Sequence, residues 1–230
     1  VRRSVDDPMF DAQVNVLGTM NLLHQAVRYG CRKVVFSSSG GAIYGEQETF
    51  PASETHAANP LSPYGISKLA GETYLRYFGT RGLSWAILRY ANVYGPRQDP
   101  HGEAGVVAIF TRAMLDGRAP TIYGDGTQTR DFVYVEDVAQ ANLLAITVAA
   151  PDLANISTGV ETTVNDLHKN LAHLTAFTGS PQHAPARTGE VYRVALDPQR
   201  AQTWLGWTAQ TPLAEQVRLF LVLAPVAEKR

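Results

Sequence analysis

The stretch Tyr64-Gly65-Ile66-Ser67-Lys68 places a phenol and an ammonium four residues apart. Side chains at positions i and i+4 of a helix lie on one face, so both groups can point into one site. A free tyrosine titrates near pH ~10 and is a poor base at neutrality. A nearby cation favours the phenolate, so we expect Lys68 to lower the pKa of Tyr64. The spacing therefore predicts a tyrosine base on a helix over residues 63–77.

A short apolar run, Val34-Val35-Phe36, precedes this helix and ends in three serines, Ser37-Ser38-Ser39. An apolar run of this length is typical of a buried strand in a parallel sheet. Ligands of open α/β sheets bind beyond the carboxyl ends of the strands. We therefore expect the serine hydroxyls to lie beside the tyrosine and lysine, where one of them can bridge the phenol to a substrate hydroxyl.

The same pattern of apolar runs and helical periodicity continues along the chain. Helices are predicted at 8–29, 63–77, 106–116, 136–149 and 163–176. Strands are predicted at 33–38, 85–90, 120–123, 132–135 and 155–157, with long loops at 40–62 and 92–105. Alternating strands and helices indicate an α/β fold with a parallel sheet. Residues 213–224 are apolar enough to form a helix that packs near the end of the chain.

Composition excludes several classes of function. The 230 residues are 45% hydrophobic and carry a formal net charge of −1, so no basic surface for nucleic acid is expected. No apolar stretch approaches the ~18 residues of a membrane span. The single cysteine, Cys31, which we expect to be buried, rules out an intrachain disulfide and suits the cytoplasm. The six histidines show no metal-binding spacing.

Five blocks of sequence resemble the extended short-chain dehydrogenases/reductases and, within them, the NAD-dependent epimerase/dehydratase family. The chain is most similar to its UDP-hexose 4-epimerases. The matching blocks are 15–19, 36–45, 62–68, 88–97 and 129–138. The resemblance implies a Rossmann-like, doubly wound parallel sheet with a smaller substrate-binding α/β cap. Residues 1–92 would be the remainder of the NAD-binding domain, and 93–230 would mainly bind the nucleotide sugar, with some segments returning to the sheet.

Members of this family open with a βαβ unit whose Gly-rich turn holds the dinucleotide pyrophosphate. Neither G-x-x-G-x-x-G nor G-x-G-x-x-G occurs here, and the sequence begins at Val1. We therefore expect the first βαβ units to be missing. The isolated 230-residue chain is expected to bind NAD poorly, to be inactive, and to be partly folded or to aggregate.

The implied activity is epimerisation at C4 of a UDP-hexose, which interconverts UDP-glucose and UDP-galactose through a transient 4-keto intermediate. By resemblance, Tyr64 takes and returns the proton of the sugar hydroxyl, and Lys68 holds the nicotinamide ribose. If the segment is aligned with the family forward from the strand at Phe36, the bridging hydroxyl falls on Ser39. If it is aligned backward from Gly45, the loop has one extra glycine, and Ser38 is the alternative.

The resemblance also assigns binding residues. Asn15 and Ala91, together with the three catalytic residues, would contact NAD. Amide and guanidinium groups suit phosphate oxygens, and the residues implied for the nucleotide sugar are Asn92, Thr121, Ile122, Tyr123, Arg130, Arg187 and Glu190. Relatives often pair through two helices, here about 10–29 and 63–78, so a homodimer of the full-length protein is expected.

Three alternatives remain open. The substrate can be another nucleotide sugar, as in a UDP-glucuronate 4-epimerase or a reductase, or the chain can be an inactive fragment or scaffold of this fold. A 4,6-dehydratase is disfavoured because Gly40-Gly41 stands where those relatives carry an acid and a base for removing water. A serine hydrolase would need a G-x-S-x-G elbow, which the sequence lacks.

Overall fold

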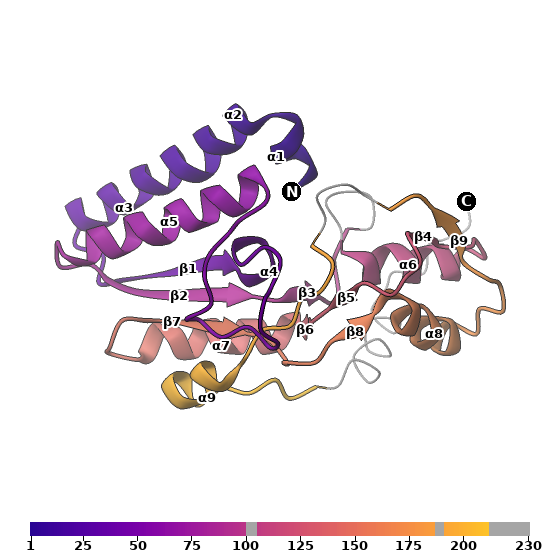
Figure 1. The fold of residues 1–230 in the computed structure, drawn as a ribbon. Coiled ribbons are helices and arrows are strands. Elements are labelled where there is room, and N and C mark those ends of the chain that lie inside the picture. The colour runs from indigo at the N-terminus through magenta and orange to yellow at the C-terminus, as the bar shows by residue number, and fades with distance from the viewer. Residues whose placement is uncertain (100–104, 187–190, 212–230) are drawn as a thin grey trace, which may run out of the picture.

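A computed structural model describes residues 1–99, 105–186 and 191–211. At its centre lies a parallel sheet with the order β1 (Lys33–Ser39), β2 (Ser84–Tyr90) and β7 (Asp152–Ile156). Helices α3 (Gly18–Arg28) and α5 (Pro63–Gly79) cover one face, while α7 (Val135–Thr147) and α9 (Gln199–Leu205) cover the other (Figure 1). This arrangement confirms the predicted α/β fold with a parallel sheet.

The first long helical segment begins at a sequence signal for a helix start. The Asp7 carboxylate accepts a hydrogen bond from the Phe10 amide, and Pro8 occupies the first helical position. The segment runs through α2 (Pro8–Asp11), the π-helical η1 (Ala12–Leu17) and α3. A single π-helical turn inside an α-helix is often found at functional sites. The short helix α1 (Arg2–Asp6), which was not predicted, precedes it.

Helix α5 begins at a second cap and lies very close to the sheet. The Ser62 hydroxyl accepts from the Gly65 amide, and Pro63 is the first helical residue. A β-carbon at Gly71 would lie 2.5 Å from the ring of Phe36 on β1. Glycine therefore permits the close approach that fixes α5 against the strand carrying the serines.

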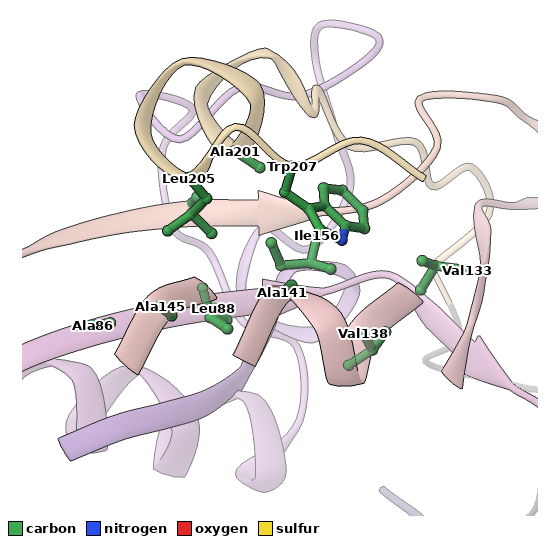
Figure 2. Packing of buried hydrophobic residues seen from close by; sticks show 11 residues of the cluster. Ala86, Leu88, Val133, Val138, Ala141, Ala145, Ile156, Ala201, Leu205 and Trp207 are labelled. Carbon is green, nitrogen blue, oxygen red and sulfur yellow. The ribbon is translucent and has the colours of Figure 1, made fainter. Parts of the chain in front are cut away.

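The opposite face of the sheet packs through small residues. Figure 2 shows Ala141 and Ala145 of α7 near Leu88 and Ile156 of the sheet, with Trp207 beside Ile156. All five are buried. Alanines let the helix axis come close to the strands, which orients the N-terminus of α7 near the carboxyl edge of the sheet.

A second region consists of two-stranded sheets and two helices. The strand pairs are β3 (Asn92–Tyr94) with β6 (Phe132–Tyr134), β4 (Thr121–Tyr123) with β9 (Gln182–Ala184), and β5 (Thr129–Arg130) with β8 (Thr162–Thr163). The first two pairs are parallel and the third is antiparallel. Helices α6 (Val106–Leu115) and α8 (Val164–Thr175) enclose a separate core that includes Phe110, Ile122 and Leu167.

Several boundary predictions were wrong. The loop predicted at 40–62 contains α4 (Gly40–Ile43), and the one at 92–105 contains β3. The strand predicted at 155–157 begins at Asp152, and Val135 starts a helix instead of ending a strand. Strands of two or three residues carry no usable periodicity, so β5, β8 and β9 were missed.

Two further expectations concern the surface and the end of the chain. Cys31 is exposed, contrary to prediction, because it lies in the turn after α3, where its thiol faces the Lys33 carbonyl. Residues 213–224 lie outside the described part. Within that part, no helix is both long and apolar enough to cross a membrane.

Candidate active site

The three predicted catalytic side chains converge at the carboxyl end of β1. Ser39 ends the strand, and its side chain is hydrogen-bonded to Tyr64 in the first turn of α5. Lys68 lies one turn further along this helix, and its Nζ donates to the Ser37 carbonyl at 2.9 Å. The Nζ also lies 5.6 Å from the ring centroid of Tyr64. The helix that carries Tyr64 and Lys68 and the strand end that carries Ser39 thus come together as predicted.

Burial dominates the protonation of this pair. It raises the pKa of Tyr64, the Ser39 hydrogen bond opposes that rise, and the Asp11 carboxylate adds to it. Burial also lowers the pKa of Lys68, and Asp11 opposes that change. The prediction that Lys68 holds the Tyr64 pKa below its usual value is therefore wrong. The Lys68 ammonium is bound to a backbone carbonyl, and burial outweighs its attraction for a phenolate.

The partners of the β1 serine hydroxyls distinguish the two candidates. Ser38 is buried and donates to Glu72 Oε1 at 2.6 Å, on the α5 side of the sheet. Ser37 lies within 3.0 Å of the Tyr90 hydroxyl. Ser39 is the serine bonded to Tyr64. These partners favour Ser39, because the hydroxyl of Ser38 is already used.

Sequence reasoning missed the buried ion pair beneath the site. Arg89 of β2 donates from Nε and Nη2 to the two carboxylate oxygens of Glu72 at 2.8 and 2.6 Å. Its guanidinium also lies 4.9 Å from the ring centroid of Tyr44. A charged residue inside the apolar run 85–90 could have signalled this pair, because a buried charge needs a partner. The pair locks α5 to the sheet below Tyr64 and Lys68.

Two glycines follow Ser39, and one of them has no room for a side chain. A β-carbon at Gly40 would lie 2.5 Å from Leu196 Cδ1, and Leu196 is fully buried. At Gly41 the nearest side-chain atom, Val194 Cγ1, would be 3.5 Å away, which is ordinary contact. An acidic pair at 40 and 41 therefore does not fit this packing, in agreement with the sequence argument against a dehydratase.

The residues expected to touch NAD lie around the same edge. Asn15 donates from Nδ2 to Asp11 Oδ1 at 2.8 Å, on the helical segment packed against α5. Ala91 follows β2, and its amide donates to the Ile156 carbonyl. A cation, a phenol and an amide at the carboxyl edge of a parallel sheet fit the nicotinamide ribose end of a dinucleotide.

Two residues predicted to bind the nucleotide sugar, Asn92 in β3 and Arg130 in β5, lie in different strand pairs. The Asn92 amide donates to the Asp131 carbonyl at 2.8 Å, and Arg130 is the neighbour of Asp131. The Asp131 carboxylate accepts from the backbone amides of Thr158 and Leu196. The structure therefore brings the backbone of Asn92 next to the residue after Arg130, whose guanidinium donates to the Thr129 and Tyr192 carbonyls. Asp131, which was not predicted, ties this point to the segments of Thr158 and Leu196.

The strand of residues 121–123, implied to contact the nucleotide sugar, is only partly available to a ligand. Thr121 is half-buried and Tyr123 is exposed, but the Ile122 side chain is 1% exposed and packs in the core with Phe110. The Ile122 side chain is therefore not available to a ligand. Arg187 and Glu190 lie outside the described residues. Among the residues described, no group of three or more His, Cys, Asp or Glu side chains forms a metal site.

Comparisons with known proteins agree with this geometry. The NAD dependent epimerase/dehydratase family matches residues 1–157. The chain is 50% identical over 219 residues to a putative UDP-glucose 4-epimerase of Methanocaldococcus jannaschii, covering 95% of this chain and 71% of that protein. The chain therefore belongs to the NAD-dependent epimerase/dehydratase family.

Solved structures place it more closely within that family. UDP-glucose 4-epimerase from Thermotoga maritima, with UDP-glucose, matches at a TM-score of 0.95 and 48% identity, covering 96% of this chain and 72% of that one. The NAD complex of UDP-glucose 4-epimerase from Thermus thermophilus matches at a TM-score of 0.89 and 44% identity, with the same coverage. The chain thus spans a little over 70% of the length of these three relatives.

Proposed function

We propose that this protein is an NAD-dependent epimerase that inverts C4 of a UDP-hexose and interconverts UDP-glucose and UDP-galactose. The observation that carries the proposal is the convergence of Ser39, Tyr64 and Lys68 at the carboxyl edge of the sheet. The high identity to UDP-glucose 4-epimerases supports the choice of reaction and substrate.

Each of the three side chains has a distinct task in this reaction. The Tyr64 phenolate takes the proton of the sugar C4 hydroxyl and, after the 4-keto sugar has turned, returns it to the C4 oxygen. The Ser39 hydroxyl, already bonded to Tyr64, relays that proton and fixes the phenol. The Lys68 ammonium favours the phenolate when charge develops there, because an adjacent cation stabilises an anion.

The cofactor and substrate would be held by the residues around this edge. NAD, when bound, supplies the hydride acceptor and donor at the sugar C4. Asn15, Ala91 and Lys68 are placed to hold its nicotinamide ribose end. Asn92, Arg130 and Arg187 offer amide and guanidinium donors to the diphosphate of the substrate, while Thr121, Tyr123 and Glu190 are proposed contacts of the nucleoside.

The test is the interconversion of UDP-glucose and UDP-galactose by the full-length protein, with and without added NAD. Tyr64→Phe is expected to lower kcat by about 10²–10⁴, the range for removing a general acid–base. Tyr77→Phe makes the same change on an exposed tyrosine of α5 and should leave kcat unchanged. Turnover that survives in Tyr64→Phe would contradict the assignment.

The substrate is tested separately from the cofactor. NAD binding without turnover of either UDP-hexose would move the substrate to another nucleotide sugar, such as UDP-glucuronate. Neither binding nor turnover would favour the inactive scaffold. The two outcomes are distinguished by measuring NAD binding by calorimetry beside the assay.

The full-length protein is further proposed to form a homodimer through α3 and α5, which pack side by side (Figure 1). Large apolar side chains remain exposed on these helices and on the segment before α3, namely Met9, Val14, Leu17, Leu22, Ile66 and Tyr77. Such a surface suits a second copy of the chain. Sedimentation as a monomer at micromolar concentration would contradict this.

A cytoplasmic location stays a prediction of the cysteine content.

A further inference from the structure

Asp11 lies beside the catalytic pair, although no sequence motif drew attention to it. Its side chain is buried, with 8% of the residue exposed. Oδ1 accepts from Asn15 Nδ2 at 2.8 Å, and Oδ2 accepts from the Ser67 hydroxyl at 2.6 Å. Ser67 sits between Tyr64 and Lys68 on α5. One buried carboxylate thus joins the helical segment of Asn15 to the catalytic helix.

We infer that Asp11 is a positioning residue for the proposed epimerisation, which holds the Asn15 amide and α5 in place and sets the charge balance between Tyr64 and Lys68. The inference rests on the proposed function. It assigns a role to a residue that touches neither the substrate nor the reacting atoms and that acts through its neighbours.

The hydrogen bonds explain the positioning part of this role. Because the Asn15 amide nitrogen donates to Asp11, the oxygen of the Asn15 amide remains as an acceptor. The Ser67 bond fixes the first two turns of α5 relative to η1, which packs against that helix. Hydrogen bonds to a charged acceptor are about twice as strong as neutral ones, so the carboxylate holds both partners more firmly than an amide would.

The charge acts in opposite senses on the two catalytic groups. An anion near Tyr64 disfavours the phenolate and raises the pKa of the tyrosine. The same anion favours the ammonium of Lys68 and opposes the effect of burial on its pKa. Asp11 therefore shifts both pKa values upward, toward the ammonium for the lysine and toward the phenol for the tyrosine.

The other charged groups around Asp11 come from the elements packed against it. Helix α1 contributes Arg3, which lines a small cavity of about 130 Å³ together with Asp11 and Asn15. The segment η1 contains no ionisable side chain. Helix α5 contributes Lys68 and also Glu72, whose carboxylate is paired with Arg89 toward the sheet. The pKa of Tyr64 itself is shifted by burial, by the Ser39 hydrogen bond and by the charge of Asp11.

The chain offers variants that separate charge from hydrogen bonding. Asp11→Asn keeps an oxygen to accept from Asn15 and gains an NH₂ group that can donate to the Ser67 hydroxyl, so it removes mainly the charge. Ser67→Ala keeps the charge and removes one hydrogen bond. Asp7→Asn is the matched control, because it removes a carboxylate from the exposed N-cap of the same helix, where asparagine caps equally well.

The first measurement is independent of activity. Tyrosine ¹³Cζ resonances of the full-length protein are titrated by NMR without substrate, and the Tyr64 signal is identified by its loss in Tyr64→Phe. In Asp11→Asn we expect Tyr64 to titrate at lower pH than in the wild type. Asp7→Asn and Ser67→Ala are expected to titrate as the wild type does. An unchanged titration in Asp11→Asn, or an equal shift in Ser67→Ala, would overturn the charge role.

The second measurement is the pH profile of kcat for UDP-galactose. The acidic limb is expected to move to lower pH in Asp11→Asn, with KM for the sugar unchanged, while Asp11→Ala also weakens NAD binding by about tenfold through loss of the Asn15 bond. If the wild type has no epimerase activity but Asp11→Asn still shifts the Tyr64 titration, the proposed function is contradicted and the charge effect of Asp11 is supported. A profile that moves equally in Asp7→Asn would overturn the inference.

Discussion

The two halves of the molecule hold their functional residues in different ways. In the catalytic half, residues 1–91 and 135–156, one continuous parallel sheet gathers Ser39, Tyr64 and Lys68 at a single edge. In the cap half, the described parts of 92–134 and 158–193, three two-stranded sheets carry the proposed substrate ligands. Their ion pairs differ too, since Glu72–Arg89 is buried whereas Glu161–Arg193 is partly exposed.

The difference shows where precision is built into the protein. The chemistry needs a phenol, a hydroxyl and an ammonium in fixed geometry, and a buried ion pair with glycine-mediated packing fixes the helix that carries two of them. The cap half carries the proposed substrate ligands on short strands, and the ion pair there is partly exposed. The predictions below test this contrast, beginning with the largest expected effect.

Breaking the buried pair should damage the catalytic half most. Glu72→Gln leaves Arg89 buried without its countercharge, and removing one partner of such a pair typically destabilises a protein by about 3–5 kcal/mol. Urea unfolding of the full-length protein measures this. Glu161→Gln is the matched control in the cap half, where its partner Arg193 is largely solvated, and it should have a much smaller effect. Equal effects would remove the contrast.

Two neighbouring serines should separate chemistry from stability. Ser39→Ala removes the hydroxyl bonded to Tyr64 and is expected to lower kcat by about 10–100-fold, the value of a hydrogen bond to a group that becomes charged. Ser38→Ala removes the bond to Glu72 and should mainly lower the free energy of unfolding. Steady-state kinetics and urea unfolding of both variants check this. The reverse pattern would make Ser38 the catalytic serine.

The two glycines after β1 test how closely this segment packs against its neighbours. Gly40→Ala forces a methyl group against the buried Leu196 and is expected to destabilise the protein by about 1–3 kcal/mol, as overpacking does. Gly41→Ala meets only ordinary contact with Val194 and should be nearly neutral. Thermal melts of the two variants provide the measurement. A fully stable Gly40→Ala would show that this loop can accept the side chains of a dehydratase.

The smallest effect concerns acid stability in the cap half. A hydrogen bond from Arg193 lowers the pKa of Glu161 below its ordinary value of 4.5, and the Thr129 hydroxyl adds to this. The lowered value means that the unfolded chain binds a proton first, so this stabilisation is present above pH 4.5 and is lost as pH falls through the folded pKa. Between about pH 6 and about pH 3.5, the free energy of unfolding should therefore fall slightly less in Glu161→Gln than in the wild type. A larger fall of the free energy of unfolding in the variant would contradict this contribution of Glu161.

Local rules were enough to predict the core of the site. Tyr64 and Lys68 share a helix face because of their spacing, and a cap at Ser62 sets where that helix begins. Ser39 lies at the end of an apolar strand, and strand ends define the ligand edge of a parallel sheet. None of these inferences needed a contact between distant segments.

Residues that work through partners far along the chain were not predictable in this way. Asp11 meets Ser67 across 56 residues, and Arg89 finds Glu72 only when β2 and α5 pack together. Ile122 belongs to a strand that looked available to a ligand, yet its side chain fills a core shared with α6 and α8. Nothing in the local pattern states which face of a three-residue strand will be buried.

The sequence by itself determined the α/β class, the helix that carries the base and its lysine, and the strand end that supplies the serine. These follow from periodicity, capping and alternation, which act over a few residues. Only the tertiary structure decided which serine faces Tyr64, that burial raises the Tyr64 pKa, and that Asp11 lies beside it. The physical reason is that burial and electrostatic partners depend on which surfaces meet, and these are set by the packing of the whole chain.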